Sequence, residues 1–191
     1  MGFIKTIFVA IFLFILSQAF GQTTQPSNQS TSQASAEALP EEVLKKTDVY
    51  EMIYPANWDL DETGLMGTTF ILFSGLNSAD DLFRENINYM VQDVSAFNLD
   101  LDAYVKLSLT QVENLINNSQ LISSDTKTDK NGNTFQRIEY TGDQGIYKLH
   151  FMQHVYLENN NAQIITFTAE QQQYTTYIEL AESIISTIVR K

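Results

Sequence analysis

The chain has 191 residues, of which 11 are lysine or arginine and 23 are aspartate or glutamate, giving a formal net charge of −12 at pH 7. Nucleic acids and anionic lipid surfaces are bound mainly through lysine and arginine, so this balance argues against both as partners. The absence of cysteine excludes a disulfide framework, a thiol nucleophile and a thiolate metal site, and we do not expect a lipoprotein.

The first 21 residues have the three parts of a secretory signal peptide. Lys5 supplies a positive charge, Ile7–Leu16 form an uninterrupted apolar run, and Ala19 and Gly21 are small residues at the expected cleavage site. The run is about half as long as the roughly 20 residues that a membrane span needs. We therefore expect cleavage after Gly21 and a periplasmic or extracellular protein without a transmembrane segment. Since Lys5 is the only charged residue before position 22, this mature chain would carry a formal charge of −13.

A flexible tether is predicted over residues 22–46. Residues 22–40 are mostly serine, threonine, glutamine and asparagine and include no aromatic residue. Such a segment has little apolar surface to offset the entropy that it loses on ordering. Residues 47–191 are enough for one folded domain whose core needs neither disulfides nor metals.

Three strands are predicted in the first half of this domain. Polar and apolar residues alternate over Tyr50–Tyr54 until Pro55 ends the ladder, and they alternate again over Asn86–Val94. Thr69–Ser74 instead has four consecutive apolar residues. A strand of this kind is covered on both faces, so we expect layers on both sides of the sheet.

The second half is predicted to contain two helices with a β-meander between them. Apolar residues recur at helical spacing over Asp100–Asn117 and over Gln173–Val189. An Asn-Gly pair in Lys130–Asn133 is a strong hairpin signal. The meander strands are expected at Leu121–Thr128, Thr134–Thr141, Ile146–Glu158 and Gln163–Ala169. This order predicts an α+β fold, with an antiparallel β-sheet of about six strands flanked by helices on both faces.

Several short motifs resemble the PsbP-like superfamily, which includes the photosystem II extrinsic subunit and the Ran-binding Mog proteins. Residues 54–58 (YPANW) resemble the YPxxW opening of these domains, and Glu85–Asn88 resemble their ENVNV-type strand. Arg137–Gly142 and Ile165–Ala169 are similar to a hairpin strand and to the last strand of the family. The resemblance implies an α/β/α sandwich without a common active site. It also implies a non-catalytic role, because members mostly assist or stabilise protein assemblies.

Within the YPxxW-like motif, Tyr54, Pro55 and Trp58 are expected to have structural roles. Trp58 is the single tryptophan of the chain. A tryptophan that follows a strand and a proline is more often buried in the core than exposed as a stacking platform for a ligand.

The two histidines, His150 and His154, are not expected to bind a metal together. Their spacing resembles HExxH, but Phe151 stands where that motif has glutamate. In the predicted strand, four residues span about 13 Å, which is too far for a pair of ligands. We therefore expect two histidines on a sheet face.

Two acidic turns resemble calcium-binding loops but are not expected to bind calcium. Asp59–Gly64 begins like an EF-hand loop, but Phe70 stands where the bidentate glutamate is needed. Asp129–Asn133 is explained by the hairpin turn, and Asp80 and Asp81 are expected beyond the other end of the Thr69–Ser74 strand. No metal or organic cofactor is therefore predicted.

The leading functional hypothesis is an exported, non-catalytic accessory domain that binds a protein partner and assists or stabilises a protein assembly. A partner with a basic surface would complement this acidic chain. Asp59, Asp61 and Glu62 cluster without an evident role in the fold and are candidate partner contacts. One alternative is a carrier of a small apolar ligand, held between the sheet and a helix. Another is a carboxylate-dependent hydrolase, although no nucleophile-elbow or phosphate-loop motif occurs.

Overall fold

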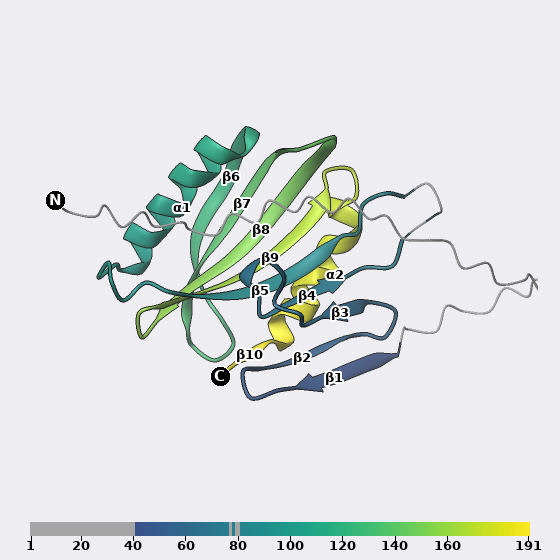
Figure 1. Ribbon diagram of the computed structural model, residues 1–191, viewed down its shortest axis with the longest axis horizontal. Coiled ribbons are helices and arrows are strands. Elements are labelled where there is room, and N and C mark those ends of the chain that lie inside the picture. The colour runs from purple at the N-terminus through teal and green to yellow at the C-terminus, as the bar shows by residue number, and fades with distance from the viewer. Residues whose placement is uncertain (1–40, 77, 79–80) are drawn as a thin grey trace, which may run out of the picture.

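The computed structural model describes residues 41–76, 78 and 81–191. The expectations for the signal peptide, for residues 22–40 and for Asp80 lie outside these residues. The described chain forms two antiparallel sheets, two α-helices and a 3₁₀ turn at Leu65–Gly67 (Figure 1).

The larger sheet has seven strands in the order β3-β4-β5-β9-β8-β7-β6, all antiparallel to their neighbours. Its strands are β3 (Asp59–Asp61), β4 (Phe70–Phe73), β5 (Asn86–Asp93), β6 (Asn117–Thr128), β7 (Thr134–Gln144), β8 (Tyr147–Glu158) and β9 (Asn161–Glu170). The predicted meander is therefore present as β6 to β9, each strand pairing with the next.

The smaller sheet has three strands in the order β1-β2-β10. Its strands are β1 (Glu42–Lys46), β2 (Tyr50–Pro55) and β10 (Val189–Arg190). Because β10 pairs with β2, the C-terminal end of the fold lies beside its N-terminal part (Figure 1).

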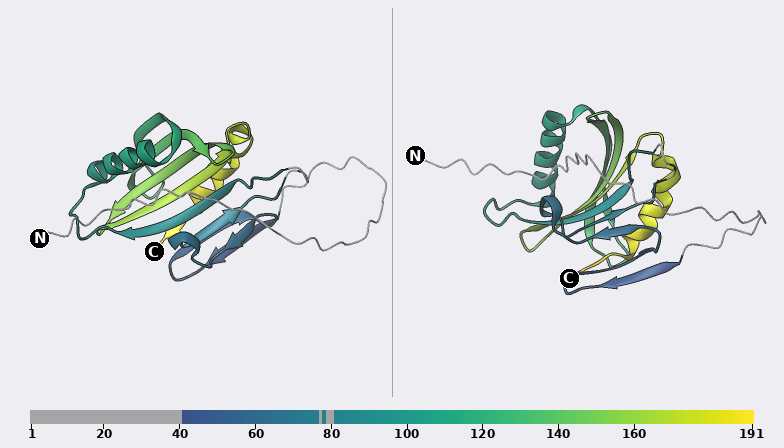
Figure 2. Two further views of the ribbon diagram at one scale, coloured as in Figure 1. Left: turned by 45° about the horizontal axis from the view of Figure 1, so that its top comes forward. Right: turned by 45° about the vertical axis from the view of Figure 1, so that its right-hand side comes forward.

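Helices α1 (Leu101–Leu115) and α2 (Tyr174–Thr187) lie on opposite faces of the seven-stranded sheet (Figure 2). Strand β4 is buried on both faces. Phe70 and Leu72 belong to the core on the α2 side, whereas Ile71 belongs to the core on the α1 side. The predicted fold class, an antiparallel α+β sandwich, is thus confirmed, and the sheet has seven strands in place of about six.

The predicted tether extends too far along the chain. Residues 42–46, assigned to it from the sequence, form β1 and pair with β2 over five residues. The pairing uses the backbone of an edge strand, and the side chains of β1 are exposed or half-buried. An edge strand of this kind carries little hydrophobic signal, so the composition of the segment resembles that of a linker.

Helix α2 ends at Thr187, two residues before the predicted end. The Thr187 hydroxyl accepts a hydrogen bond from the backbone N–H of Ile53 in β2, at 2.9 Å. Ile188 has an extended backbone, and Val189 joins β10. The sequence analysis placed Val189 in the helix because apolar residues continue past the point where the backbone turns toward β2. Within the described residues, neither helix is long and apolar enough to cross a membrane.

Candidate functional site

Both histidines of the chain lie on β8 and face α2. The His150 ring stacks on Tyr174, with ring centroids 3.4 Å apart and 3° between the planes. His154 lies against Phe135 of β7, with 4.4 Å between centroids. The two side chains thus contact different aromatic rings on one sheet face. In the part of the chain that the structure describes, no group of three or more histidines and acids could hold a metal ion.

A charged cluster fills the space between β7 and α2 beside His150. The Arg137 guanidinium lies 3.1 Å from the Glu139 carboxylate and 2.9 Å from that of Glu182 on α2. The Tyr174 hydroxyl donates a hydrogen bond to Glu139. Burial by itself would raise the pKa of Glu139, but the hydrogen bonds from Tyr174 and Arg137 lower it overall. Glu139 is therefore held as a carboxylate that is matched by Arg137.

His150 is adjacent to this cluster. Burial lowers its pKa, although the charge of Glu139, whose carboxylate lies 3.9 Å away, acts in the opposite direction. The imidazole is thus neutral at neutral pH, and the cluster consists of paired charges and stacked rings. This arrangement suits the attachment of α2 to the sheet better than proton transfer.

A cavity of about 170 Å³, partly open to solvent, lies next to the cluster, under the C-terminal half of α2. Its floor is formed by aromatic residues of β7 and β8, and its rim is formed by α2 and the β6–β7 turn. The floor residues are Phe135, His154 and Tyr156. The cavity is the feature that a carrier of small ligands would need.

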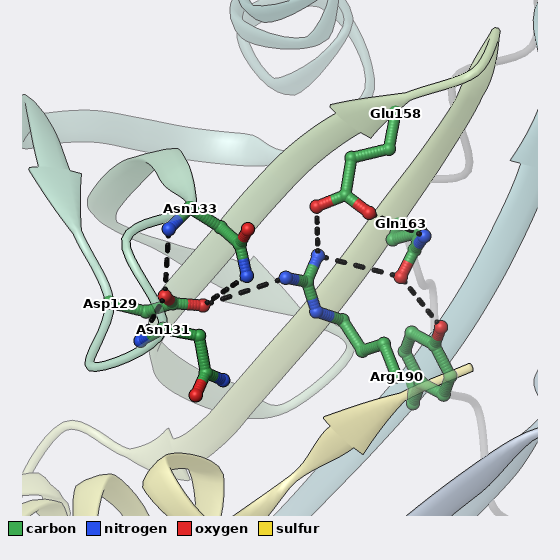
Figure 3. Close-up of polar contacts among 7 residues, drawn as sticks. Asp129, Asn131, Asn133, Glu158, Gln163 and Arg190 are labelled. Carbon is green, nitrogen blue, oxygen red and sulfur yellow. Dashed lines mark hydrogen bonds and ion pairs between the residues drawn. The ribbon is translucent and has the colours of Figure 1, made fainter.

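Arg190 of β10 links the β6–β7 turn to β8 beside this cavity (Figure 3). Its guanidinium lies 3.5 Å from Asp129 in the β6–β7 turn and 3.2 Å from Glu158 at the end of β8. The guanidinium also stacks over the Tyr156 ring, 3.4 Å from the centroid. The side chain of Arg190 is only 8% exposed, so β10 is held to the turn and to β8 by a largely buried cation.

Asp129 organises the hairpin turn that resembled a calcium loop. One carboxylate oxygen accepts hydrogen bonds from the backbone N–H groups of Asn131 and Asn133, and the other accepts from the Asn133 side chain (Figure 3). These hydrogen bonds and the charge of Arg190 lower the pKa of Asp129 against the opposing effect of burial. The acid thus has a structural partner on each side.

The three candidate contact acids, Asp59, Asp61 and Glu62, also have intramolecular partners. Asp59 forms an ion pair with Arg84, and the carboxylate of Asp61 accepts a hydrogen bond from the Thr63 backbone. Glu62 accepts hydrogen bonds from Lys45 and from the Tyr50 hydroxyl. These acids therefore have partners in the fold that were not evident from the sequence, because Arg84, Lys45 and Tyr50 lie in segments that a local sequence pattern does not connect.

The tryptophan of the YPxxW-like motif lies in the core. Trp58 is 5% exposed and makes an edge contact with Tyr177 of α2, with 6.2 Å between ring centroids. Tyr54 packs against the same core, and Pro55 ends β2.

An exposed apolar surface lies at the end of the large sheet, where three loops meet. Leu82 and Ile146 are 74% and 82% exposed, the highest values among the large hydrophobic residues that the structure describes. Both line a hollow of about 410 Å³ that is open to solvent, together with Tyr147, Asp81 and Glu170. We call these five residues the tip surface.

The loop that carries Leu82 is fixed from below. The Tyr147 hydroxyl donates a hydrogen bond to the Leu82 backbone carbonyl at 3.1 Å, and the Phe83 ring packs against Tyr147 with 5.1 Å between centroids. Phe83 is itself buried in the core on the α1 side. The backbone that carries the exposed Leu82 side chain is therefore tied to β8 and to the core.

Solved structures share this architecture. Cyanobacterial PsbP from Synechocystis superposes with a TM-score of 0.57 at 14% identity, over 84% of this chain and 98% of that one. The chain has a PsbP-like fold. The family resemblance drawn from the sequence is thus confirmed for the fold, although no family model matches the chain and no curated protein is similar to it in sequence.

Two further structures show the same PsbP-like arrangement. PA94, a Pseudomonas aeruginosa protein of unknown function, gives a TM-score of 0.56 at 14% identity, over 78% of this chain and 97% of that one. LpqN, which is involved in cell envelope biogenesis of Mycobacterium tuberculosis, gives 0.57 at 11% identity, over 78% and 90%.

The sequence analysis did not identify the charged cluster, the cavity or the tip surface of this PsbP-like domain. Alternation in β7 places Arg137 and Glu139 on one face, which was a usable signal. The register that sets Arg137 opposite His154, and the helix that covers both, required the tertiary structure. Ile146 and Leu82 belong to turns 64 positions apart, and no local pattern links them.

Proposed function

We propose that this protein is an exported, non-catalytic accessory domain that binds a protein partner through the tip surface. The observation that supports this role is the exposure of Leu82 and Ile146 side by side on a hollow at the sheet end. Exposed apolar groups that gather on one surface commonly mark sites of protein interaction. The exported location rests on the predicted signal peptide.

The acids of the tip surface favour a partner with basic residues. Asp81 and Glu170 flank the two apolar side chains in the same hollow. Burial, followed by the charge of Asp81, raises the pKa of Glu170, so the two acids of the tip surface repel each other. A partner with apolar side chains next to lysine or arginine would complement this surface. Of the three candidate acids from the sequence, Asp59 forms an ion pair with Arg84, which follows Leu82 by two positions.

A hydrolase is less well supported by the described carboxyl groups. Glu85 has a pKa raised mainly by burial, which is typical of a catalytic acid. However, Glu85 is only 1% exposed and lies beneath the tip, within 3.4 Å of the Ser74 hydroxyl. A substrate could not reach this carboxyl without displacing the surrounding chain.

Capture of partners from the envelope of the native host, with the full exported chain as bait, tests the proposal. The bait variant Leu82→Asp/Ile146→Asp should lose the partner that the unaltered chain retains. Leu121→Asp/Ile122→Asp is a matched control, because these residues are also exposed and apolar but lie on β6. Equal retention by both variants would contradict binding at the tip.

A further inference from the structure

Strand β6 forms one edge of the seven-stranded sheet and is the longest edge strand in the described part of the chain. It has 12 residues and pairs with β7 on one side only. The strand at the opposite edge, β3, has three residues, and short edge strands offer few backbone groups for pairing. The free edge of β6 is therefore the place where a further strand could form the longest backbone ladder.

Only the second half of β6 is regular enough for such pairing. Two register shifts interrupt its pairing with β7 between Asn117 and Ser123, and β-bulges turn an edge away from approaching strands. Over residues 123–128, in contrast, successive residues of β6 pair with successive residues of β7 without a shift. The exposed Leu121 and Ile122 belong to the irregular half. The regular half therefore presents polar side chains.

On one face of the regular half, two hydroxyl side chains are bound to a buried amide. The Thr126 hydroxyl donates a hydrogen bond to Oε1 of Gln136 at 3.0 Å, and Nε2 of Gln136 donates to the Ser124 hydroxyl at 2.9 Å. Gln136 is 8% exposed and lies opposite Thr126 on β7. The edge is thus attached to the sheet by side chains as well as by its backbone. Its small side chains on this face leave room for a neighbouring strand.

The other face of the regular half carries two opposite charges. Asp125 and Lys127 are both exposed, and side chains two positions apart in a strand share a face. Among the residues that the structure describes, neither forms an ion pair. Arg137 lies opposite Asp125 on β7, but its guanidinium is paired with Glu139 and Glu182. Both charges are therefore available to a strand that adds to this edge.

A second copy of β6 would pair with both charges at once. When two identical strands pair antiparallel about a two-fold axis, the residue on the axis faces its own copy, and the residues on its two sides face each other. With Thr126 on the axis, Asp125 of each copy would face Lys127 of the other. An axis at Asp125 or at Lys127 would place like charges opposite each other, which destabilises a sheet. The charge pattern therefore favours the axis at Thr126.

We propose that the protein forms a symmetric dimer in which residues 124–128 of two β6 strands pair antiparallel about Thr126, with Asp125 of each copy ion-paired to Lys127 of the other. The pairing joins two seven-stranded sheets into one continuous sheet. It does not use the tip surface, because Ile146 follows the opposite end of β7 from the β6–β7 turn. Each dimer would therefore present two free tip surfaces to other proteins.

Sedimentation equilibrium of the exported protein over a range of concentrations tests the proposal, and we expect a monomer–dimer equilibrium. Asp125→Lys and Lys127→Asp should each raise the dissociation constant of the dimer roughly tenfold, because two attractive pairs become repulsive. The two variants change the net charge in opposite directions, so general repulsion between acidic chains would not weaken both dimers. Lys106→Asp is a matched control, since it makes the same charge change as Lys127→Asp at an exposed position of α1. It should leave the dissociation constant nearly unchanged.

Exchange of the two charges tests the register directly. The double variant Asp125→Lys/Lys127→Asp should recover the dissociation constant of the unaltered protein, and an equimolar mixture of the two single variants should form a heterodimer. Leu82→Asp/Ile146→Asp should dimerise normally, which separates this interface from binding at the tip. A monomer at every concentration, weakening in only one single variant, failure of the exchange to restore the dimer, or loss of the dimer in the tip variant would each overturn the proposal.

Discussion

At Gly142 of β7, the residue that follows α1 packs closely against the sheet. A Cβ atom at this position would lie 2.2 Å from Cγ2 of Ile116, a buried residue at the end of α1. We therefore predict that Gly142→Ala lowers the free energy of unfolding by about 1–3 kcal/mol, because overpacking forces the helix end away from the strand. Urea denaturation of both proteins measures the difference.

Gly75→Ala is the matched control for this prediction. A Cβ atom at Gly75 would make an ordinary contact, 3.7 Å from the nearest described atom, so this variant should be nearly as stable as the unaltered protein. If the two variants lost equal stability, close packing at Ile116 would not be the cause.

Arg190 provides a second prediction about a single residue. Arg190→Met keeps an unbranched apolar stem but removes the guanidinium, which leaves Asp129 and Glu158 without their cation. We expect a loss of roughly 2 kcal/mol, since Asp129 is half-buried and its charge would be compensated only by the hydrogen bonds from Asn131 and Asn133. Lys46→Met, which removes the well-exposed cation paired with Glu51, should have no measurable effect on the urea midpoint.

His154 is predicted to make stability depend on pH. Its pKa is lowered from 6.5 to about 4 in the fold, so the unfolded chain takes up a proton first as the pH falls. Stability is therefore lost between about pH 6.5 and pH 4, and the loss levels off below that range. The shift corresponds to a loss of order 3 kcal/mol.

His154→Phe should remove this contribution. The difference in unfolding free energy between the variant and the unaltered protein should change by that amount from pH 7 to pH 4, as followed by urea titrations at each pH. Parallel pH profiles for the two proteins would show that His154 does not titrate in this range.

Among the elements, β1 sets the N-terminal limit of the folded domain. A chain that begins at residue 41 retains β1, whereas one that begins at residue 47 loses its five-residue pairing with β2 and the Lys45–Glu62 ion pair. We expect only the shorter chain to melt earlier, by roughly 4 °C or more, because a loss of about 1 kcal/mol shifts the midpoint by a few degrees. Calorimetry of the two truncated chains measures the difference in melting temperature. Equal values would show that residues 42–46 behave as a tether and do not stabilise the domain as a strand.

The elements themselves could largely be predicted, because each one carries its own periodic pattern. The Asn131-Gly132 pair correctly predicted the β6–β7 turn. Asp100 caps the N-terminus of α1, as its position before the apolar helical pattern predicted. What could not be predicted depends on contacts between distant segments. Val189 fits a helical stripe, but its position is decided by pairing with Glu51, and the partners of Glu62 are known only once β1 and β2 are placed.

At the scale of the whole molecule, the excess of acids predicts salt-sensitive association. The formal charge of −12 and the acids of the tip surface should attract a basic partner at long range, and dissolved salt screens this attraction. We expect less partner to be captured at physiological than at low ionic strength. Quantitative mass spectrometry of the captured material measures the change, and unchanged recovery would argue for a contact without electrostatic steering.

The pairing of β10 with β2 has a consequence for the kinetics of folding. Each hairpin of the meander closes between neighbouring segments, but Ile53 and Thr187 form their hydrogen bonds across 134 positions. Closing so large a loop costs entropy before any contact compensates for it, and topologies with distant contacts fold slowly. The meander can therefore form while its α2 face is still open to water. The time needed to complete the domain is then set by the arrival of α2 and β10, and not by the strands that make up most of the sheet.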